Sequence, residues 1–269
     1  MHDYHMHSHF CRHATGGIED YARRALDLGF TEICCTPHIP LPGFRPGFVD
    51  DRLRMDPDEL PRYLEELEEA RARLSGLTIL SGIEADYIEG WEEYLSHFLS
   101  SHSFDFVLMS IHFIGKWPKG QWVFEHSADT RPIESIYDDY FDAMEAGIRT
   151  GLFDCVAHLD LIKEKGHPVM ATHRERVRAV IDLCLEKGMS AEINTSGCRK
   201  EIGEAYPSEG IVRLMASRGL PLVPGSDAHA PAQVGHGFEK LAAMGAVEFA
   251  RYRGRRIVGT TKAGRVSPS

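Results

Sequence analysis

The sequence has no long uninterrupted apolar segment, although 43% of its 269 residues are hydrophobic. No stretch approaches the ~20 continuous apolar residues that a membrane-spanning helix needs. The N-terminus, MHDYHMHSHFCRHA, has neither a basic start nor an apolar run, so we expect no signal peptide. These absences predict a cytoplasmic protein that has no membrane as a partner.

Basic residues are in the minority, with 30 Lys and Arg against 40 Asp and Glu and a formal net charge of −10. Binding to a nucleic-acid backbone depends on clustered Lys and Arg. We therefore expect no nucleic acid as a partner. A small anionic substrate stays compatible with this charge, because bound cations make a pocket locally positive.

Cysteine is sparse and has no C-x-x-C spacing. Three of the six cysteines, Cys34, Cys35 and Cys155, stand in apolar runs that are typical of strands. Reduced cysteine behaves there as a small core residue. The pattern predicts free thiols in a reducing compartment and no disulfide framework.

Short apolar runs alternate with longer segments of helical spacing along the whole chain. Candidate strands are Asp3–Met6, Glu32–Thr36, Leu77–Ile83, Phe104–Ile111, Phe153–Ala157, Met189–Ile193 and Leu220–Val223. Candidate helices are Gly17–Leu28, Asp58–Leu74, Ile133–Thr150, His173–Lys187 and Ser208–Ser217. Such alternation predicts a parallel α/β sheet. Seven units without a break in composition predict one domain over residues 1–269, folded as a closed or nearly closed barrel.

Histidine is abundant, with fifteen residues, and many histidines follow the candidate strands. The side chains at or just beyond the strand ends are His5, His7, His9, His13, His38, Glu84, His112, His158, Glu192, Asn194, Asp227 and His229. The C-terminal ends of barrel strands meet at one face, where the working residues of such enzymes lie. The distribution therefore predicts one shared metal site.

The spacing within this set supports a metal site. His5 and His7 stand two apart on a strand and point to one face, and Asp227 and His229 repeat that spacing. A carboxylate such as Glu84 can bridge two ions. An isolated H-x-H pair is more often chance, and GSDAH alone fits a turn with an N-cap aspartate. The joint pattern favours metal binding, and this mixture of imidazole and carboxylate suits Zn, Fe or Mn.

These motifs resemble the PHP (polymerase and histidinol phosphatase) superfamily, and more narrowly its monofunctional histidinol-phosphate phosphatases. The resemblance runs through DYHMHSHFCRHA, TPHIP, GIEADYI, FDFVLMSIHFI, VAHLDLIK, EINTSGCRK with YPS after it, and GSDAH with a later Val-Gly. It implies a distorted (β/α)7 TIM-like barrel that holds three divalent transition-metal ions. It also implies that the substrate is a small phosphate monoester, L-histidinol phosphate.

The resemblance also implies a ligand set for each ion. His5, His7, Glu84 and Asp227 would hold the first ion, Glu84, His112 and His158 the second, and His13, His38 and His229 the third. His9 is an alternative to His13, which is favoured because the longer spacing suits a loop that reaches a separate ion. Pro37 stands where relatives often have an acidic residue, which leaves the orientation of His38 open.

The mechanistic hypothesis is attack on phosphorus by a hydroxide between the first two ions, with Asp227, Glu84 and His229 as catalytic residues. Either a metal-bound water or His229 would protonate the leaving group. Arg199 is the predicted phosphate clamp, since a guanidinium meets phosphate oxygens as a fork, and the alternative is a solvated loop arginine. Lys163 is the second, weaker candidate for phosphate binding. Apolar walls are available from Trp117, Trp122, Phe124 and the loop Phe44–Phe48.

Three other functions fit part of the pattern. A PHP phosphoesterase for nucleotides, oligonucleotide ends or phosphotyrosine would use the same ligands, because ligands determine the chemistry and not the substrate. A metal-dependent amidohydrolase on a similar barrel would typically recruit a carboxylated lysine as the bridge, a place that Glu84 fills here. A non-catalytic zinc site would need four ligands, and nine exceed that need.

Overall fold

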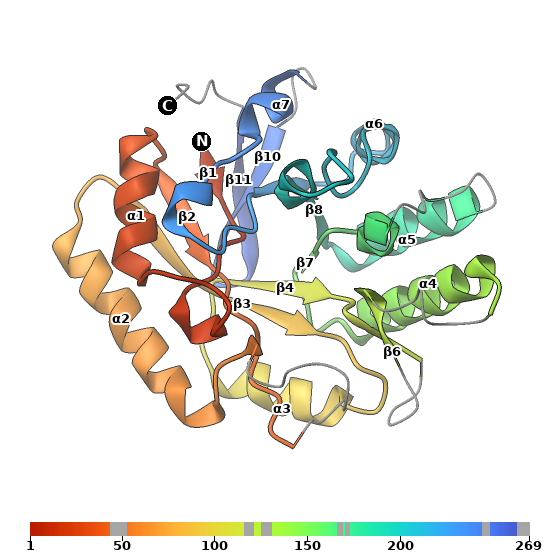
Figure 1. Ribbon diagram of the computed structural model, residues 1–269, viewed down its shortest axis with the longest axis horizontal. Coiled ribbons are helices and arrows are strands. Elements are labelled where there is room, and N and C mark those ends of the chain that lie inside the picture. Colours follow the sequence, from red (N-terminus) through yellow and green to blue (C-terminus); the bar gives the residue numbers. More distant parts are fainter. Residues whose placement is uncertain are drawn as a thin grey trace.

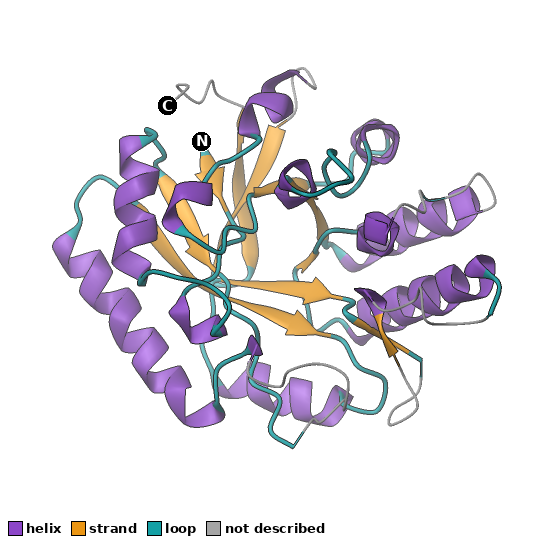
Figure 2. Cartoon of the chain, viewed as in Figure 1, coloured by secondary structure: helices purple, strands orange, loops and turns teal. Residues whose placement is uncertain are grey.

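The computed structural model describes residues 1–43, 53–115, 121–124, 131–165, 169, 173–243 and 248–262. Seven parallel strands follow one another in sheet order and lie inside a ring of helices (Figures 1 and 2). The strands are β1 (His2–Asp3), β2 (Glu32–Cys35), β3 (Thr78–Asp86), β4 (Phe106–Ser110), β7 (Cys155–Val156), β8 (Ser190–Asn194) and β9 (Leu222–Gly225). This arrangement confirms the predicted α/β class and its order of strands.

One α-helix follows each of these strands. The helices are α1 (Ile18–Asp27), α2 (Leu60–Arg73), α3 (Glu92–Ser101), α4 (Ile133–Thr150), α5 (Arg174–Lys187), α6 (Glu209–Ser217) and α7 (Phe238–Ala243). Short 3-10 turns are η1 (His9–Cys11), η3 (Pro57–Glu59), η5 (Leu161–Lys165), η7 (Ser196–Arg199) and η8 (Pro231–Gln233). The five predicted helices are present to within two residues at each end, whereas α3 and α7 were not predicted.

Local sequence explains where three of the helices begin or end. Helix α1 begins after Gly17, whose backbone N–H donates to the Asp20 side chain. Helices α4 and α5 end at Gly151 and Gly188, both at a φ of 68°, where a residue without a Cβ avoids strain.

The first and last strands of the barrel meet at the end where the parallel strands finish. There the backbone N–H of His7 donates to Ala228 O (2.9 Å), and the backbone N–H of Asp227 donates to His5 O (2.8 Å). Met6 and Ala228 form a parallel bridge. These bonds join the chain after β1 to the chain after β9, as a barrel requires.

A C-terminal hairpin that was not predicted closes the opposite end. Strand β10 (Glu248–Arg253) runs parallel to β9 and antiparallel to β11 (Arg256–Lys262). The backbone N–H of Tyr252 donates to Tyr4 Oη (3.0 Å), and Arg251 and Arg253 pair with Glu32 on β2. Strand β10 therefore lies between β9 and β1 at their N-terminal end, which makes the barrel irregular.

A separate two-stranded sheet joins β5 (Phe113–Ile114) and β6 (Gln121–Trp122).

The barrel interior is apolar at one end and polar at the other. Tyr4, Leu80, Phe106, Cys155, Val223 and Tyr252 belong to one buried cluster inside the strands. Alternation along β3 puts Leu80 and Glu84 on the same face, so Glu84 also points inward. A larger apolar cluster packs the helices against the strands.

Two further predictions can be compared with the structure. All six cysteines are free thiols. No helix in the described ranges combines the length and the hydropathy that membrane crossing requires.

Candidate metal centre

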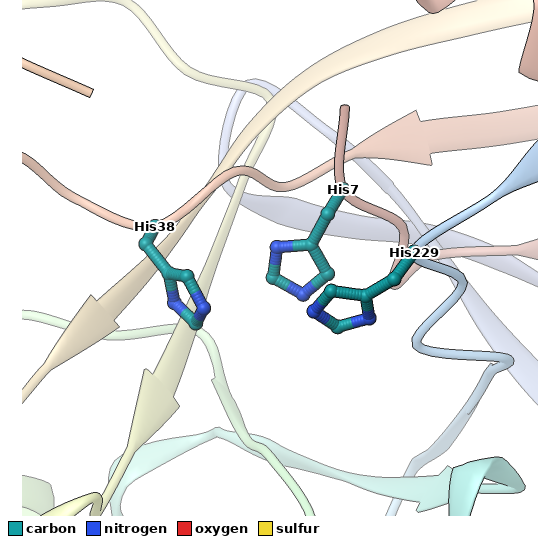
Figure 3. A group of neighbouring side chains, drawn as sticks. All are labelled: His7, His38 and His229. Carbon is teal, nitrogen blue, oxygen red and sulfur yellow. The ribbon is translucent and has the colours of Figure 1, made fainter. Parts of the chain in front are cut away.

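The predicted ligands come together at the end of the barrel where the parallel strands finish. Glu84 lies within β3, two residues before its end, and not beyond the strand as predicted. The remaining ligands come from the segments after β1, β2, β4, β7 and β9. Figure 3 shows His7, His38 and His229, from three of these segments, with rings directed into one space. The rings of His7 and His229 stack with centroids 4.1 Å apart.

Glu84 is the centre of the arrangement. Its Oε1 lies 3.1 Å from His158 Nε2 and 3.8 Å from His112 Nε2. Its Oε2 lies 2.9 Å from His38 Nδ1 and 3.4 Å from the Nε2 atoms of both His5 and His7. The two oxygens of this one buried carboxylate thus face two different groups of imidazoles, as a bridging ligand would.

Asp227 lies beside His5 and His7, in the group that faces Glu84 Oε2. Its Oδ1 lies 3.1 Å from His7 Nε2 and 3.6 Å from His5 Nε2. Asp227 has a φ of 52° and His158 a φ of 26°, a region that residues with a Cβ rarely occupy. Strain of this kind gathers at functional sites.

His13, and not His9, joins the centre. His13 Nε2 lies 2.9 Å from His229 Nε2, whereas the exposed His9 turns its Nε2 toward Glu66 Oε2 (3.6 Å). His229 Nε2 therefore has a second imidazole beside it, as in a shared coordination sphere. The structure thus brings together all nine residues of the predicted ligand set.

Electrostatics leave these groups in states that bind cations. Burial, together with nearby His38, lowers the pKa of His7 to about 3, and burial lowers the pKa of His38 to about 4. Both imidazoles are therefore neutral at pH 7 and offer lone pairs. Burial raises the pKa of Glu84, but His38 and His5 outweigh that effect and hold it well below its usual value.

The pKa of His5 reflects the three carboxylates around its ring. Burial lowers its pKa, but Glu192, Asp227 and Glu84 outweigh the burial and raise it well above its usual value. The three carboxylates thus favour a positive charge at this point, and a metal cation would supply it in place of the proton.

Unsatisfied polar atoms also fit a cation. Among the described residues, Glu84 Oε2 and His38 Nδ1 are buried without a hydrogen bond, although they lie 2.9 Å apart. Buried polar atoms are normally hydrogen-bonded or bound to an ion. The triads His5–His7–Glu84 and Glu84–His112–His158 each present three ligand atoms within 4.8 Å of one another. The residues present therefore fit divalent transition-metal ions.

Partners outside the predicted set hold several ligands in place. Asp86 Oδ1 lies 2.7 Å from His112 Nδ1, and its other oxygen accepts a hydrogen bond from Arg54 (2.9 Å). Cys11 Sγ accepts the backbone N–H of His38 and lies 3.2 Å from His7 Nδ1. Contacts of this kind fix the orientation of a liganding imidazole. Asp86 was not predicted as a site residue, although its i+2 spacing from Glu84 places both on one face of β3.

The two predicted phosphate-binding residues have other partners. Arg199 donates to the carbonyl oxygens of Ser226 and Asp227, at 2.9 Å each. Lys163 is fully buried, and its Nζ lies 2.8 Å from Ala205 O and 2.9 Å from Asp160 Oδ2. Their role in phosphate binding stays a prediction.

A cavity of about 720 Å³ opens over the centre. All nine predicted ligands except His5 line it, together with Leu53, Arg54, Phe113, Trp122, Phe124, Leu161, Glu164 and Lys200. Trp122 and Phe124 are therefore walls, as predicted, whereas Trp117 and the whole predicted wall Phe44–Phe48 lie outside the described residues. The volume suits a small molecule.

Comparisons with known proteins identify the family of this chain. The PHP domain model matches residues 3–196. A Deinococcus radiodurans protein described as "probable histidinol-phosphatase" is 37% identical over 241 residues, which is 88% of this chain and 89% of the relative. The histidinol-phosphatase of Bacillus subtilis is 30% identical over 262 residues, 88% of this chain and 96% of the relative.

The fold also matches a solved structure. The Lactococcus lactis histidinol phosphate phosphatase, crystallised with zinc, L-histidinol and phosphate, superposes with a TM-score of 0.78. Its sequence is 22% identical, and the match covers 96% of this chain and 98% of the other. This likeness establishes the shared fold.

Proposed function

The chain belongs to the PHP family, and from that premise we propose that it hydrolyses L-histidinol phosphate to L-histidinol and phosphate, as a metal-dependent phosphomonoesterase of histidine biosynthesis. Two relatives at 30% identity or more are histidinol-phosphatases by name. The observation that carries the proposal is the convergence of nine imidazole and carboxylate side chains, with Glu84 among them, under a cavity that suits a small substrate.

The proposed centre holds three divalent ions, of Zn, Fe or Mn. His5, His7, Glu84 and Asp227 would hold the first, Glu84, His112 and His158 the second, and His13, His38 and His229 the third. The contacts of His7 with Asp227, of His158 with Glu84 and of His229 with His13 support this division, while His38 also lies 2.9 Å from Glu84 Oε2. Bound ions of this kind supply hydroxide at neutral pH and positive charge for the phosphoryl oxygens.

Asp227 is the residue best placed to orient the attacking water. Burial raises its pKa, but His5 and His7 outweigh the burial and hold it well below its usual value, so the carboxylate is ionised. Its Oδ2 is held by Asn194 (3.3 Å), whereas its Oδ1 faces His7 and the cavity side of the site. An oriented water can then approach phosphorus opposite the leaving alkoxide.

The cavity also carries charges for the two ends of the substrate. Lys200 is a cation at the cavity wall, and its Nζ lies 2.6 Å from Glu164 Oε2. We assign Lys200 to the phosphoryl oxygens and Glu164 to the ammonium or imidazole of the amino alcohol, since each charge is opposite to that of its partner. Trp122 and Phe124 would cover the apolar part.

A substrate panel tests the proposal. Metal-loaded protein is assayed for phosphate release from L-histidinol phosphate, a nucleoside monophosphate and phosphotyrosine at matched concentrations. We expect kcat/KM for L-histidinol phosphate to exceed the other values by at least about tenfold, a difference of ~1.4 kcal/mol in transition-state binding. An equal or higher value for another ester would overturn the substrate assignment.

A further inference from the structure

Strand β8 supplies none of the proposed ligands, yet its end carries two buried polar side chains, Glu192 and Asn194. Their exposed fractions are 1% and 0%. They stand two apart on the strand and therefore point to the same face, into the barrel. Buried polar groups of this kind are retained where they have partners to hold.

Glu192 reaches two of the proposed ligands. Its Oε1 lies 2.7 Å from His5 Nδ1, and its Oε2 accepts the backbone N–H of His158 at 2.8 Å. His158 is one of the two ligands whose backbone has a positive φ. One carboxylate thus contacts the side chain of a ligand of the first ion and the backbone of a ligand of the second.

Asn194 extends the same network to a third ligand. Its Nδ2 donates to Glu192 Oε2 (3.1 Å) and to Asp227 Oδ2 (3.3 Å). Its Oδ1 accepts the backbone N–H of Ser196 (2.9 Å), which fixes which end of the amide is the donor. The hydrogen bond from Asn194 holds Oδ2 of Asp227, and Oδ1 of Asp227 faces His7.

The fold keeps a space open for Glu192. A Cβ built on Gly225 of β9 would collide with Glu192 Oε1 and would lie 2.7 Å from His5 Cβ. A side chain at position 225 would therefore displace the carboxylate from His5. The missing side chain on β9 thus permits the contact between β8 and His5.

We propose that Glu192 and Asn194 are positioning residues, which set the tautomer of His5 and the orientation of Asp227 for the first ion. This inference rests on the metal site of the proposed function. The carboxylate accepts the proton of His5 Nδ1, so the lone pair of His5 Nε2 points toward Glu84 (3.4 Å) and Asp227 (3.6 Å).

The Glu192→Gln variant separates this role from simple packing, because glutamine has nearly the same shape. The amide oxygen must stay with the two donors, the His158 N–H and Asn194 Nδ2. The amide NH₂ then faces His5 Nδ1, and His5 must carry its proton on Nε2, where the ion would bind. A reversed amide would place its NH₂ against both donors and lose both hydrogen bonds.

The experiment measures metal affinity by chelator competition, with Glu32→Gln as the matched control. Glu32 is another glutamate with a 1% exposed fraction, but it lies at the opposite end of the barrel. We expect Glu192→Gln to weaken binding of one ion per chain by about 10–100-fold, and Glu32→Gln to leave all affinities unchanged. Circular dichroism compares the folding of the metal-free forms. If Glu192→Gln lost metal only because it was unfolded, the proposal would be contradicted.

A second variant tests the other half of the network. Asn194→Ala removes the donor to Asp227 and should lower kcat more than it raises KM, with a smaller loss of metal affinity. Unchanged affinity in Glu192→Gln together with unchanged kcat in Asn194→Ala would overturn the inference. A wild-type chain that binds metals but does not hydrolyse L-histidinol phosphate would instead overturn the proposed function, and the affinity comparison would remain valid.

Discussion

The Nε2 atom of His7 lies 3.1 Å from Oδ1 of Asp227, a residue 220 positions further along the chain. The contact exists because the segments after β1 and β9 are hydrogen-bonded, from Asp227 N to His5 O and from His7 N to Ala228 O. Closure of the barrel and assembly of the metal centre are therefore the same structural event. The account predicts that each proposed ligand matters for both metal binding and turnover.

Asp227→Asn should lower kcat about 100-fold or more, because the amide cannot replace the charge that faces His7 and His5. Steady-state kinetics at saturating metal measure the effect. Asp182→Asn is the matched control, since Asp182 forms an exposed ion pair with Arg218, and it should leave kcat unchanged. A kcat within twofold of wild type in Asp227→Asn would remove this residue from the catalytic set.

Lys200→Met and Arg199→Met should differ in their response to inorganic phosphate. Lys200 lines the cavity, whereas the Arg199 guanidinium is bound to the carbonyl oxygens of Ser226 and Asp227. We expect the inhibition constant for phosphate to rise about tenfold in Lys200→Met, a loss of ~1.4 kcal/mol. In Arg199→Met we expect kcat to fall and the inhibition constant for phosphate to remain unchanged. If the inhibition constant for phosphate rose in Arg199→Met and not in Lys200→Met, the result would support the phosphate-binding role predicted for Arg199 from the sequence.

Lys163→Met should destabilise the fold by about 3–5 kcal/mol, because it leaves the buried carboxylate of Asp160 without its cation. Burial already raises the pKa of Asp160 to about 6, even though the Lys163 ammonium opposes the rise. A proton removes the unpaired charge below that pH, so the destabilisation should be smaller at pH 5 than at pH 8. Urea unfolding of wild type and variant at both pH values measures the loss of stability. An equal loss at pH 5 and pH 8 would contradict the ion pair between Lys163 and Asp160.

The positions of the ligands could be predicted because the ends of parallel strands meet at one edge, so the end of each apolar run identifies candidates. The predicted strand Asp3–Met6 was too long: β1 ends at Asp3, so His5 and His7 lie in the segment after it and not on a strand. The H-x-H-x5-H spacing favoured His13 over His9, and the structure places His13 beside His229.

The surrounding contacts could not be predicted in the same way. The contact of Arg199 with two backbone carbonyls depends on the turn that Asp227 makes at a φ of 52°, which no side-chain pattern reveals. Strand β10 was missed because its burial depends on Tyr4 and Glu32, which are far away in sequence. Long-range partners of this kind require the folded coordinates.

Glu32→Gln should lower stability in a way that depends on pH. Burial raises the pKa of Glu32, but Arg251, Arg253 and Tyr4 outweigh the burial and lower it to about 2. A depressed carboxyl pKa stabilises the fold above the unfolded value of ~4.3 and loses that effect as the pH falls toward 2. The difference in unfolding free energy between wild type and variant, about 1–2 kcal/mol at pH 7 because Arg251 and Arg253 are partly exposed, should therefore shrink below pH 4.5. A difference that stays constant down to pH 3 would contradict this ion-pair account.

The number of metal ions per chain tests the central claim most directly. Inductively coupled plasma mass spectrometry on protein purified without chelator should find two to three divalent transition-metal ions per chain, and Glu84→Gln should lose at least one of them. The Glu84 carboxylate faces His5 of the first proposed group and His158 of the second, so its replacement should affect the first and second ions. Active wild-type protein with less than one ion per chain, or full occupancy in Glu84→Gln, would contradict the account.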